Sequence, residues 1–290
     1  MHYSIGHYIL KRIANLEVTV RVALAQIITG RDLADNLALV EEYARKAKDG
    51  GAALVVFPEA TMRAFGHSLL DIAEPLDGPW ASRVRAIAAE LDVVIVAGMF
   101  TPGSEPGAGS GPRKVRNTLL ATGPGVDASY DKIHLFDAYG FAESDTVDAG
   151  TGPVTFEAAG ITFGLATCYD IRFPDLFTEN ADRGAQVNIV CASWGSGPGK
   201  VEQWQLLARA RAIDSTTVVL ACGQGNAAGE SVPAKGSAPT GVGHSAVVSP
   251  FGEVIDELDG GPGLLFAELD PDVVTNARAV LPVLANRHRF

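Results

Sequence analysis

The sequence predicts an α/β fold in which parallel and antiparallel strands are mixed within one domain. Apolar runs of strand length alternate with amphipathic helical segments in the first half of the chain, which is typical of βαβ units. Glycine-containing turns later join short strands into hairpins, so antiparallel pairing is expected as well. Neither of the two Gly/Pro/Ser-rich loops separates halves of different composition, and we expect a single domain over residues 18–290.

The first clear strand is Val20–Gln26, and residues 1–17 before it form an N-terminal extension of uncertain role. Asp32 is a typical N-cap and opens a helix whose apolar residues lie three or four apart. The elements expected next are a strand at Ala53–Phe57, a helix at Trp80–Leu91, a strand at Val93–Phe100, and a hairpin of Val115–Ala121 with Ala128–His134.

The second half of the chain begins with a polar stretch, Asp137–Gly152, which contains Glu143. A hairpin of Val154–Phe156 and Ile161–Ala166 then leads directly into Cys168. We leave open whether the Gly/Pro/Ser-rich loop 226–243 gates a pocket. Elements that we expect to complete the fold are helices at Phe173–Arg183 and Gln203–Ile213 and near Pro271, and strands at Gln186–Cys191, Thr216–Cys222, His244–Ser249, Glu253–Leu258 and Leu264–Leu269, the last three closing the sheet.

Composition argues against several classes of partner. The 34 acidic residues outnumber the 23 basic ones, and the resulting net charge of −11 disfavours binding to nucleic acid or to anionic membranes. No apolar run approaches the roughly 18 residues that a membrane-spanning helix needs. Residues 1–17 lack the apolar block and cleavage site of a signal peptide. We therefore expect a cytoplasmic protein.

The 3 cysteines are Cys168, Cys191 and Cys222, an odd number without CxxC spacing, which favours neither a disulfide framework nor a zinc site. Cys191 and Cys222 lie within apolar strands, and we expect both in the core. Cys168 instead ends an apolar strand just before a helix start, where partial positive charge would favour a thiolate. It is a candidate nucleophile, with a buried core cysteine as the alternative.

Glu59, Cys168 and Trp194 each follow a predicted strand, at the end where polar groups line the ligand crevice of such folds. A glutamate behind a wholly apolar strand can have a raised pKa and accept a proton near neutral pH. Lys132 lies in a predicted strand with alternating pattern, and an inward-facing lysine could stabilise an oxyanion and a thiolate. Taken alone, Glu59 and Lys132 are each better explained as solvated surface residues.

Three segments together resemble the signatures of the carbon–nitrogen hydrolase (nitrilase) superfamily: Phe57–Glu59, Tyr130–Leu135 and Cys168–Pro174. The resemblance extends in order from about Val20 to the C-terminus. Further matching segments are Phe141–Ser144, Ala192–Trp194, Gln203–Trp204, Ala208–Ile213, Gly243–Ser245 and Leu281–Leu284 with Arg287.

The resemblance implies a four-layer αββα sandwich with a Glu–Lys–Cys site. Carried over by position, Cys168 is the nucleophile, Glu59 the general base and Lys132 the residue that stabilises the tetrahedral intermediate. Glu143 would be a supporting polar residue, and the backbone N–H of Tyr169 would face the oxyanion. A thioester acyl-enzyme would form with release of ammonia and then be hydrolysed by water. Neither a metal nor an organic cofactor is required.

Within the superfamily, Cys168–Leu176 is most similar to the small-amidase branch, which includes deaminated-glutathione amidase and omega-amidase. True nitrilases usually carry Trp-Glu after the cysteine, so Tyr169-Asp170 counts against a nitrile substrate. Arg172 could clamp a substrate carboxylate, or it could pair with a nearby acid, Asp170 or Asp175. Trp194 is the second candidate substrate-binding residue.

The predicted function is hydrolysis of the amide bond of a small, carboxylate-bearing substrate. Alternatives are an N-carbamoyl amino-acid hydrolase, an amide-dependent transferase, a non-catalytic scaffold and a thiol redox protein. The last of these is disfavoured because no resolving cysteine lies close in sequence. Relatives imply at least a homodimer, with Phe173–Arg183 and Gln203–Ile213 near the interface.

Two histidines, His134 and His244, are further candidates for a functional role. His134, close to Lys132, suggests a Cys–His glutaminase instead. We take the alternation of side chains along a strand to place His134 away from the catalytic side, and expect a structural, hydrogen-bonding role. His244 could be structural or functional.

Overall fold

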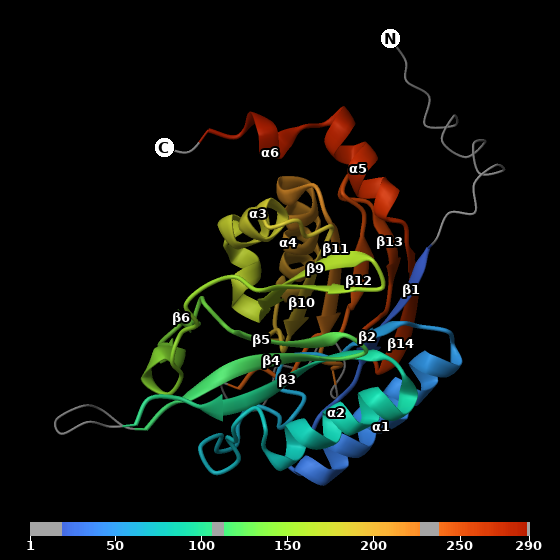
Figure 1. Ribbon diagram of the computed structural model, residues 1–290. Helices are drawn as coiled ribbons and strands as arrows, with labels where there is room; N and C mark the ends of the chain where they lie inside the picture. Colours follow the sequence, from blue (N-terminus) through green and yellow to red (C-terminus); the bar gives the residue numbers. More distant parts are fainter. Residues whose placement is uncertain (1–18, 106–112, 227–237, 289–290) are drawn as a thin grey trace.

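The protein is described from a computed structural model, which covers residues 19–105, 113–226 and 238–288. Two six-stranded sheets pack face to face, and a pair of helices covers the outer face of each sheet (Figure 1). The α/β class and the αββα sandwich are therefore confirmed. The expected extension at residues 1–17 and most of loop 226–243 lie outside the described residues. None of the helices within the three described ranges has the length and apolar content that crossing a bilayer demands.

The first sheet has the order β14-β1-β2-β3-β4-β5, with β1, β2 and β3 parallel to one another. Helices α1 (Leu33–Asp49) and α2 (Pro79–Leu91) cover it, at the bottom of Figure 1. Asp32 caps α1 as predicted, because its carboxylate accepts the N–H groups of Ala34 and Asp35. The strands are β1 (Val20–Gln26), β2 (Leu54–Val56), β3 (Val94–Pro102), β4 (Val115–Gly123), β5 (Val126–Asp131) and β14 (Gly263–Leu269).

The second sheet has the order β13-β12-β11-β10-β9-β8, and β9, β10 and β11 are parallel. Helices α3 (Pro174–Asp182) and α4 (Lys200–Ser215) cover its outer face. The strands are β8 (Thr155–Ala158), β9 (Ile161–Thr167), β10 (Val187–Ala192), β11 (Val218–Gly223), β12 (Ala246–Val248) and β13 (Val254–Glu257).

The last strand corrects one expectation. We expected the final three strands to close one sheet, but only β12 and β13 join the second sheet, whereas β14 crosses to the first. There it pairs antiparallel with the whole of β1, from Val20↔Leu269 to Gln26↔Gly263. The physical reason is that β1 is buried and its second edge needs hydrogen-bond partners. The chain then continues into α5 (Pro271–Val280) and α6 (Val283–Asn286).

The apolar core fills the space between the two sheets. Val22 and Leu24 of β1 pack there together with residues of the second sheet, whereas the alternate residues Ala23 and Ala25 pack against α1 and α2. The polar stretch that follows β5 forms a small hairpin, β6 (Asp137–Ala138) with β7 (Phe141–Ala142), and a 3₁₀ turn, η3 (Glu143–Asp145). The 3₁₀ turn carries Glu143, which is buried.

Candidate active site

Glu59 is held at the centre of the site, between the two sheets. It lies three residues after the end of β2, and only 1% of it is exposed. One carboxylate oxygen accepts hydrogen bonds from Asn117 Nδ2 at 2.8 Å and from Lys132 Nζ at 3.3 Å. The other accepts the backbone N–H of Ser193, just beyond β10, at 2.8 Å. Donors from three different segments therefore fix the orientation of this carboxylate.

Lys132 is buried between two carboxylates. Its Nζ lies 2.8 and 3.0 Å from the oxygens of Glu143 in η3, in addition to its contact with Glu59. We expected Lys132 inside a strand, but β5 ends one residue earlier, at Asp131. The backbone N–H of Lys132 still bonds to Asn117 at 2.9 Å, and the chain then leaves the ladder toward Glu143. The Lys132 side chain is buried, and its ammonium group contacts carboxylates from two different segments.

Cys168 occupies a sharp bend directly after β9. Its φ of 48° is in the left-handed region, which is strained for a residue other than glycine and often marks a functional position. The Sγ atom lies 3.9 Å from the carbonyl oxygen of Ser193. The helix expected to start at the cysteine is only a short 3₁₀ turn, η4 (Cys168–Arg172), and α3 begins at Pro174. The position of the thiol is therefore set by this bend, because no long helix begins at the cysteine.

Burial and neighbouring charges set the protonation states. Burial raises the pKa of the Glu59 carboxyl, with Lys132 opposing and Glu143 adding to this effect. Burial also raises the pKa of the Cys168 thiol well above its usual range, as does the Glu59 charge, while Lys132 opposes both. For Lys132, burial alone would lower the pKa, but the two carboxylates outweigh it and raise the pKa. The surroundings thus favour the neutral thiol and the charged lysine, and they make the Glu59 carboxylate a stronger base than an ordinary one.

Two residues that position this group were missed by sequence reasoning. Asn117 of β4 is buried, and it holds both the Glu59 carboxylate and the Lys132 backbone. Gly98 of β3 packs against the segment that carries Glu59, because a Cβ there would lie only 2.7 Å from the backbone nitrogen of Ala60. Asparagine is depleted in strands, so Asn117 within the predicted strand Val115–Ala121 was a signal that could have revealed the first of them.

A buried hydrogen-bond network centred on Asp170 holds the bend at Cys168 in place. One oxygen of this fully buried carboxylate accepts the Tyr130 hydroxyl at 2.6 Å and the Thr167 N–H at 2.9 Å. The other accepts the backbone N–H of His134 at 2.9 Å and lies 2.7 Å from its Nδ1. The His134 ring also stacks on Phe173, with 3.8 Å between ring centroids. The network ties the end of β5, which precedes Lys132, to the segment carrying Cys168.

His134 therefore makes structural contacts, although our argument for that outcome was wrong. The strand ends before Lys132, and residues two apart in a strand would share a face rather than oppose one another. His244 likewise contacts a carboxylate, because its Nδ1 lies 2.8 Å from Glu257. Cys191 and Cys222 are both fully buried core residues, as expected.

Arg172 and Trp194 lie together beside the nucleophile. The Arg172 Nη2 donates to Gln203 of α4 at 2.9 Å, and its guanidinium carbon lies 5.1 Å from the centre of the Trp194 ring. The suggested ion pair of Arg172 with Asp170 or Asp175 is wrong, because Asp170 is fully occupied elsewhere and Gln203 is the partner. Trp194 is 5% exposed and donates its indole N–H to the Lys200 carbonyl at 3.0 Å.

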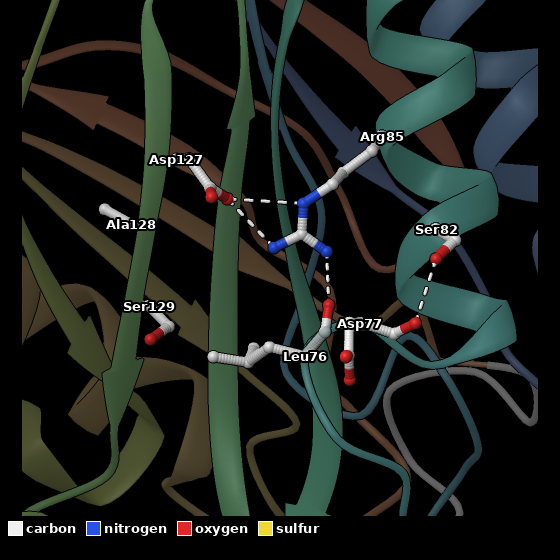
Figure 2. A pocket seen from close by; sticks show the side chains of 7 residues that line it. All are labelled: Leu76, Asp77, Ser82, Arg85, Asp127, Ala128 and Ser129. Carbon is white, nitrogen blue, oxygen red and sulfur yellow. Dashed lines mark hydrogen bonds and ion pairs between the residues drawn. The ribbon is translucent and has the colours of Figure 1, made fainter.

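A hollow lies away from these residues, between α2 and β5 (Figure 2). It has a volume of about 470 Å³, and none of the candidate catalytic residues lines it. Its central cation, Arg85, is already paired with Asp127 at 2.9 Å and donates to the Leu76 carbonyl. We regard it as a structural tie between helix and sheet. In the part of the chain that the structure describes, no group of three or more His, Cys, Asp or Glu side chains is arranged to hold a metal ion.

Comparisons with known proteins place this architecture in a class of hydrolases that includes amidases. A hydrolase of Mycobacterium tuberculosis is 54% identical over 276 residues, which is 93% of this chain and 96% of that protein. A deaminated glutathione amidase of Escherichia coli O157:H7 is 33% identical, over 87% of this chain and 91% of its own.

A solved structure adds chemical detail about a relative. It is a variant of the amidase from Nesterenkonia sp. AN1 that carries the acetamide moiety of fluoroacetamide covalently on its active-site cysteine. It aligns with a TM-score of 0.70 and 28% identity over 91% of this chain and 95% of that one. The carbon–nitrogen hydrolase family model matches residues 21–279. The chain belongs to the carbon–nitrogen hydrolase family, and it is an enzyme of the amidase type within the nitrilase superfamily.

Proposed function

We propose that the protein hydrolyses the amide bond of a small, carboxylate-bearing substrate through a thioester on Cys168. The observation that carries this proposal is the buried Glu59 carboxylate. It is bonded to Lys132 and to the N–H of Ser193, whose carbonyl oxygen lies 3.9 Å from the Cys168 sulfur. A proton acceptor, a fixed cation and a thiol thereby belong to one site. The covalent adduct on the cysteine of the Nesterenkonia amidase supports the same assignment by analogy.

In the acylation step, Glu59 takes the thiol proton while Sγ of Cys168 attacks the amide carbon. The negative charge that develops on the carbonyl oxygen is stabilised by the Lys132 ammonium and by the backbone N–H of Tyr169. The C–N bond then breaks, and Glu59 returns its proton to the leaving nitrogen, which departs as ammonia. A thioester remains on Cys168. The raised pKa of Glu59 suits this shuttle because such a carboxylate is a stronger base than an ordinary one.

In the deacylation step, Glu59 takes a proton from a water molecule, whose oxygen attacks the thioester carbon. The same two donors stabilise the second tetrahedral intermediate. The C–S bond breaks, the sulfur regains the proton from Glu59, and the carboxylic acid product leaves. Glu143 supports both steps by holding the Lys132 ammonium, to which it bonds at 2.8 Å.

We assign recognition of the substrate carboxylate to Arg172. Among the described residues, only Gln203 accepts a hydrogen bond from this guanidinium, so its remaining donors can bind a carboxylate in a bidentate manner. Trp194 would form the wall against which the substrate lies. Arg172→Lys should therefore raise KM for carboxylate-bearing amides and leave neutral short amides much less affected. Equal losses on both kinds of substrate would show that Arg172 supports the site instead of binding the substrate.

The test of the reaction class is ammonia release from a panel of ω-amides, carbamoyl amino acids and nitriles. We expect turnover of ω-amides by the native enzyme and none by Cys168→Ala, with the fold of the variant retained. An alanine variant that releases ammonia at the native rate would refute the mechanism. Preference for carbamoyl amino acids or nitriles would refute the substrate class.

We further propose that the enzyme is a cytoplasmic homodimer or higher homo-oligomer that associates near α3 and α4. Two large apolar side chains of α4, Leu206 and Ile213, are 65% and 40% exposed, which supports an interface on that helix. Closed two-fold assembly is also the commonest arrangement of soluble homo-oligomers. Light scattering at micromolar concentration should give at least twice the chain mass of 30.3 kDa. A monomer mass would contradict this proposal.

A further inference from the structure

Two cations flank a single aromatic ring beside the nucleophile. The Arg172 guanidinium carbon lies 5.1 Å and the Lys200 ammonium 6.0 Å from the centre of the Trp194 ring. The two charges are therefore separated by at most the sum of these distances, about 11 Å. Trp194 follows Ser193, whose carbonyl oxygen lies next to the Cys168 sulfur. Both cations thus lie around the residue that directly follows the one in contact with the nucleophile.

Neither cation forms an ion pair with a carboxylate in the described part of the chain. Within residues 19–105, 113–226 and 238–288, no carboxylate lies within ion-pair distance of Arg172 or Lys200, although acidic residues outnumber basic ones in the whole chain. The Lys200 ammonium instead lies over two aromatic rings, 5.2 Å from the centre of Tyr139 and 6.0 Å from that of Trp194. Aromatic faces attract a cation without cancelling its charge. The ammonium therefore keeps its ability to bind an anion.

The position of Lys200 favours an anion further. Lys200 is the first residue of α4, which is 16 residues long and has no side-chain cap at its N-terminus. The partial positive charge of that helix end adds to the charge of the ammonium. Tyr139, over which the ammonium lies, is 87% exposed, so this part of the site is open to solvent. An anionic group at the outer end of a substrate could reach it.

We infer that Lys200 binds a second anionic group of the substrate, so that the site selects amides that carry two carboxylates. This inference rests on the amidase function proposed above. Arg172 binds the carboxylate nearer the reacting amide, and Lys200 binds the outer one. Two fixed cations beside one ring favour a ligand with two carboxylates over a ligand with one, since the latter leaves one cation without a partner.

Binding to the inactive Cys168→Ala variant tests this inference separately from turnover. The ligands are butyramide, the monoamide of glutarate and the monoamide of tricarballylate, which carry no, one and two carboxylates. We expect the tricarballylate monoamide to bind most tightly by calorimetry. Adding Lys200→Met should weaken that ligand by about ten- to a hundredfold, the range for a lost charge-assisted hydrogen bond, and change the other two little. Lys200→Arg should restore most of the affinity.

Lys46→Met on α1 is the matched control, since it removes one lysine charge from the outer layer of the other sheet. It should leave all three affinities unchanged. Equal affinity of the one- and two-carboxylate ligands, or equal loss of both on Lys200→Met, would overturn the inference. Failure of the native enzyme to release ammonia from any amide would instead refute the proposed function, because the binding experiment does not depend on turnover.

Discussion

Asp170 offers the sharpest test of how the nucleophile is held, because its carboxylate is fully buried and accepts from four donors. Asp170→Asn preserves the shape of the side chain but replaces one oxygen by an NH₂ group. If the NH₂ group replaces the oxygen shared by Tyr130 and Thr167, the hydroxyl can rotate to accept, but the Thr167 N–H cannot. If it replaces the other oxygen, the His134 ring can change tautomer, but the His134 backbone N–H cannot.

In either orientation one backbone N–H loses its acceptor inside the protein. An orphaned buried donor costs about 1–3 kcal/mol, and loss of the charge strengthens the penalty because hydrogen bonds to ionised groups are the stronger ones. We expect Asp170→Asn to lower the free energy of unfolding by about 2–4 kcal/mol. For a chain of this size that corresponds to a fall in Tm of about 4–8 °C. The bend that carries Cys168 should loosen, so kcat should fall as well.

Urea unfolding followed by circular dichroism, together with ammonia release, measures both effects. Asp145→Asn is the matched control, because Asp145 is exposed in η3 and the same change there should stay within about 0.5 kcal/mol. An Asp170→Asn variant as stable and as active as Asp145→Asn would refute our account of the network.

The remaining predictions concern the residues around the thiol. The acid limb of kcat/KM should lie above the ordinary carboxyl range, because burial raises the pKa of Glu59 and only its ionised form can act as base. Glu143→Gln should move that limb to lower pH, since the Glu143 charge contributes to the raised pKa; an unmoved or raised limb would exclude Glu59 as the titrating base. Lys132→Ala should lower kcat by about 10²- to 10³-fold, and Glu59→Gln at least as much, as measured by ammonia release; near-native rates would require another oxyanion donor or base. Gly98→Ala should reduce kcat, because the new Cβ would lie 2.7 Å from the backbone beside Glu59, whereas Gly152→Ala, with open space around it, should not.

Most of the fold could be predicted because hydrophobic periodicity reports burial, and here each strand and helix has its own pattern. The pairing of β14 with β1 could not, since the two strands lie at opposite ends of the chain and neither pattern specifies its partner. The exact end of β5 also escaped prediction. It depends on the attraction of Lys132 for two carboxylates, which are distant in sequence or in the following loop.

The three candidate catalytic residues were found through their motifs, and the structure brings Glu59, Lys132 and Cys168 into one cluster with Glu143. The residues that hold these side chains in position were harder to predict. The partners of Asp170 are Thr167, just before the cysteine, and Tyr130 and His134, more than 30 residues earlier in the chain, so no local spacing indicates the whole set. The sequence suggests acids close to Arg172 as its partners, whereas its actual partner, Gln203, lies on α4.

The central claim is that the reaction passes through an acyl group on one particular sulfur. Mass spectrometry of the native enzyme, stopped with acid during turnover of an ω-amide and digested, tests it most directly. We predict an added acyl mass on the peptide that contains Cys168, none on those that contain Cys191 or Cys222, and none anywhere in Cys168→Ala. Ammonia release from an enzyme whose Cys168 stays unmodified under these conditions, or an acyl group on another residue, would contradict the account.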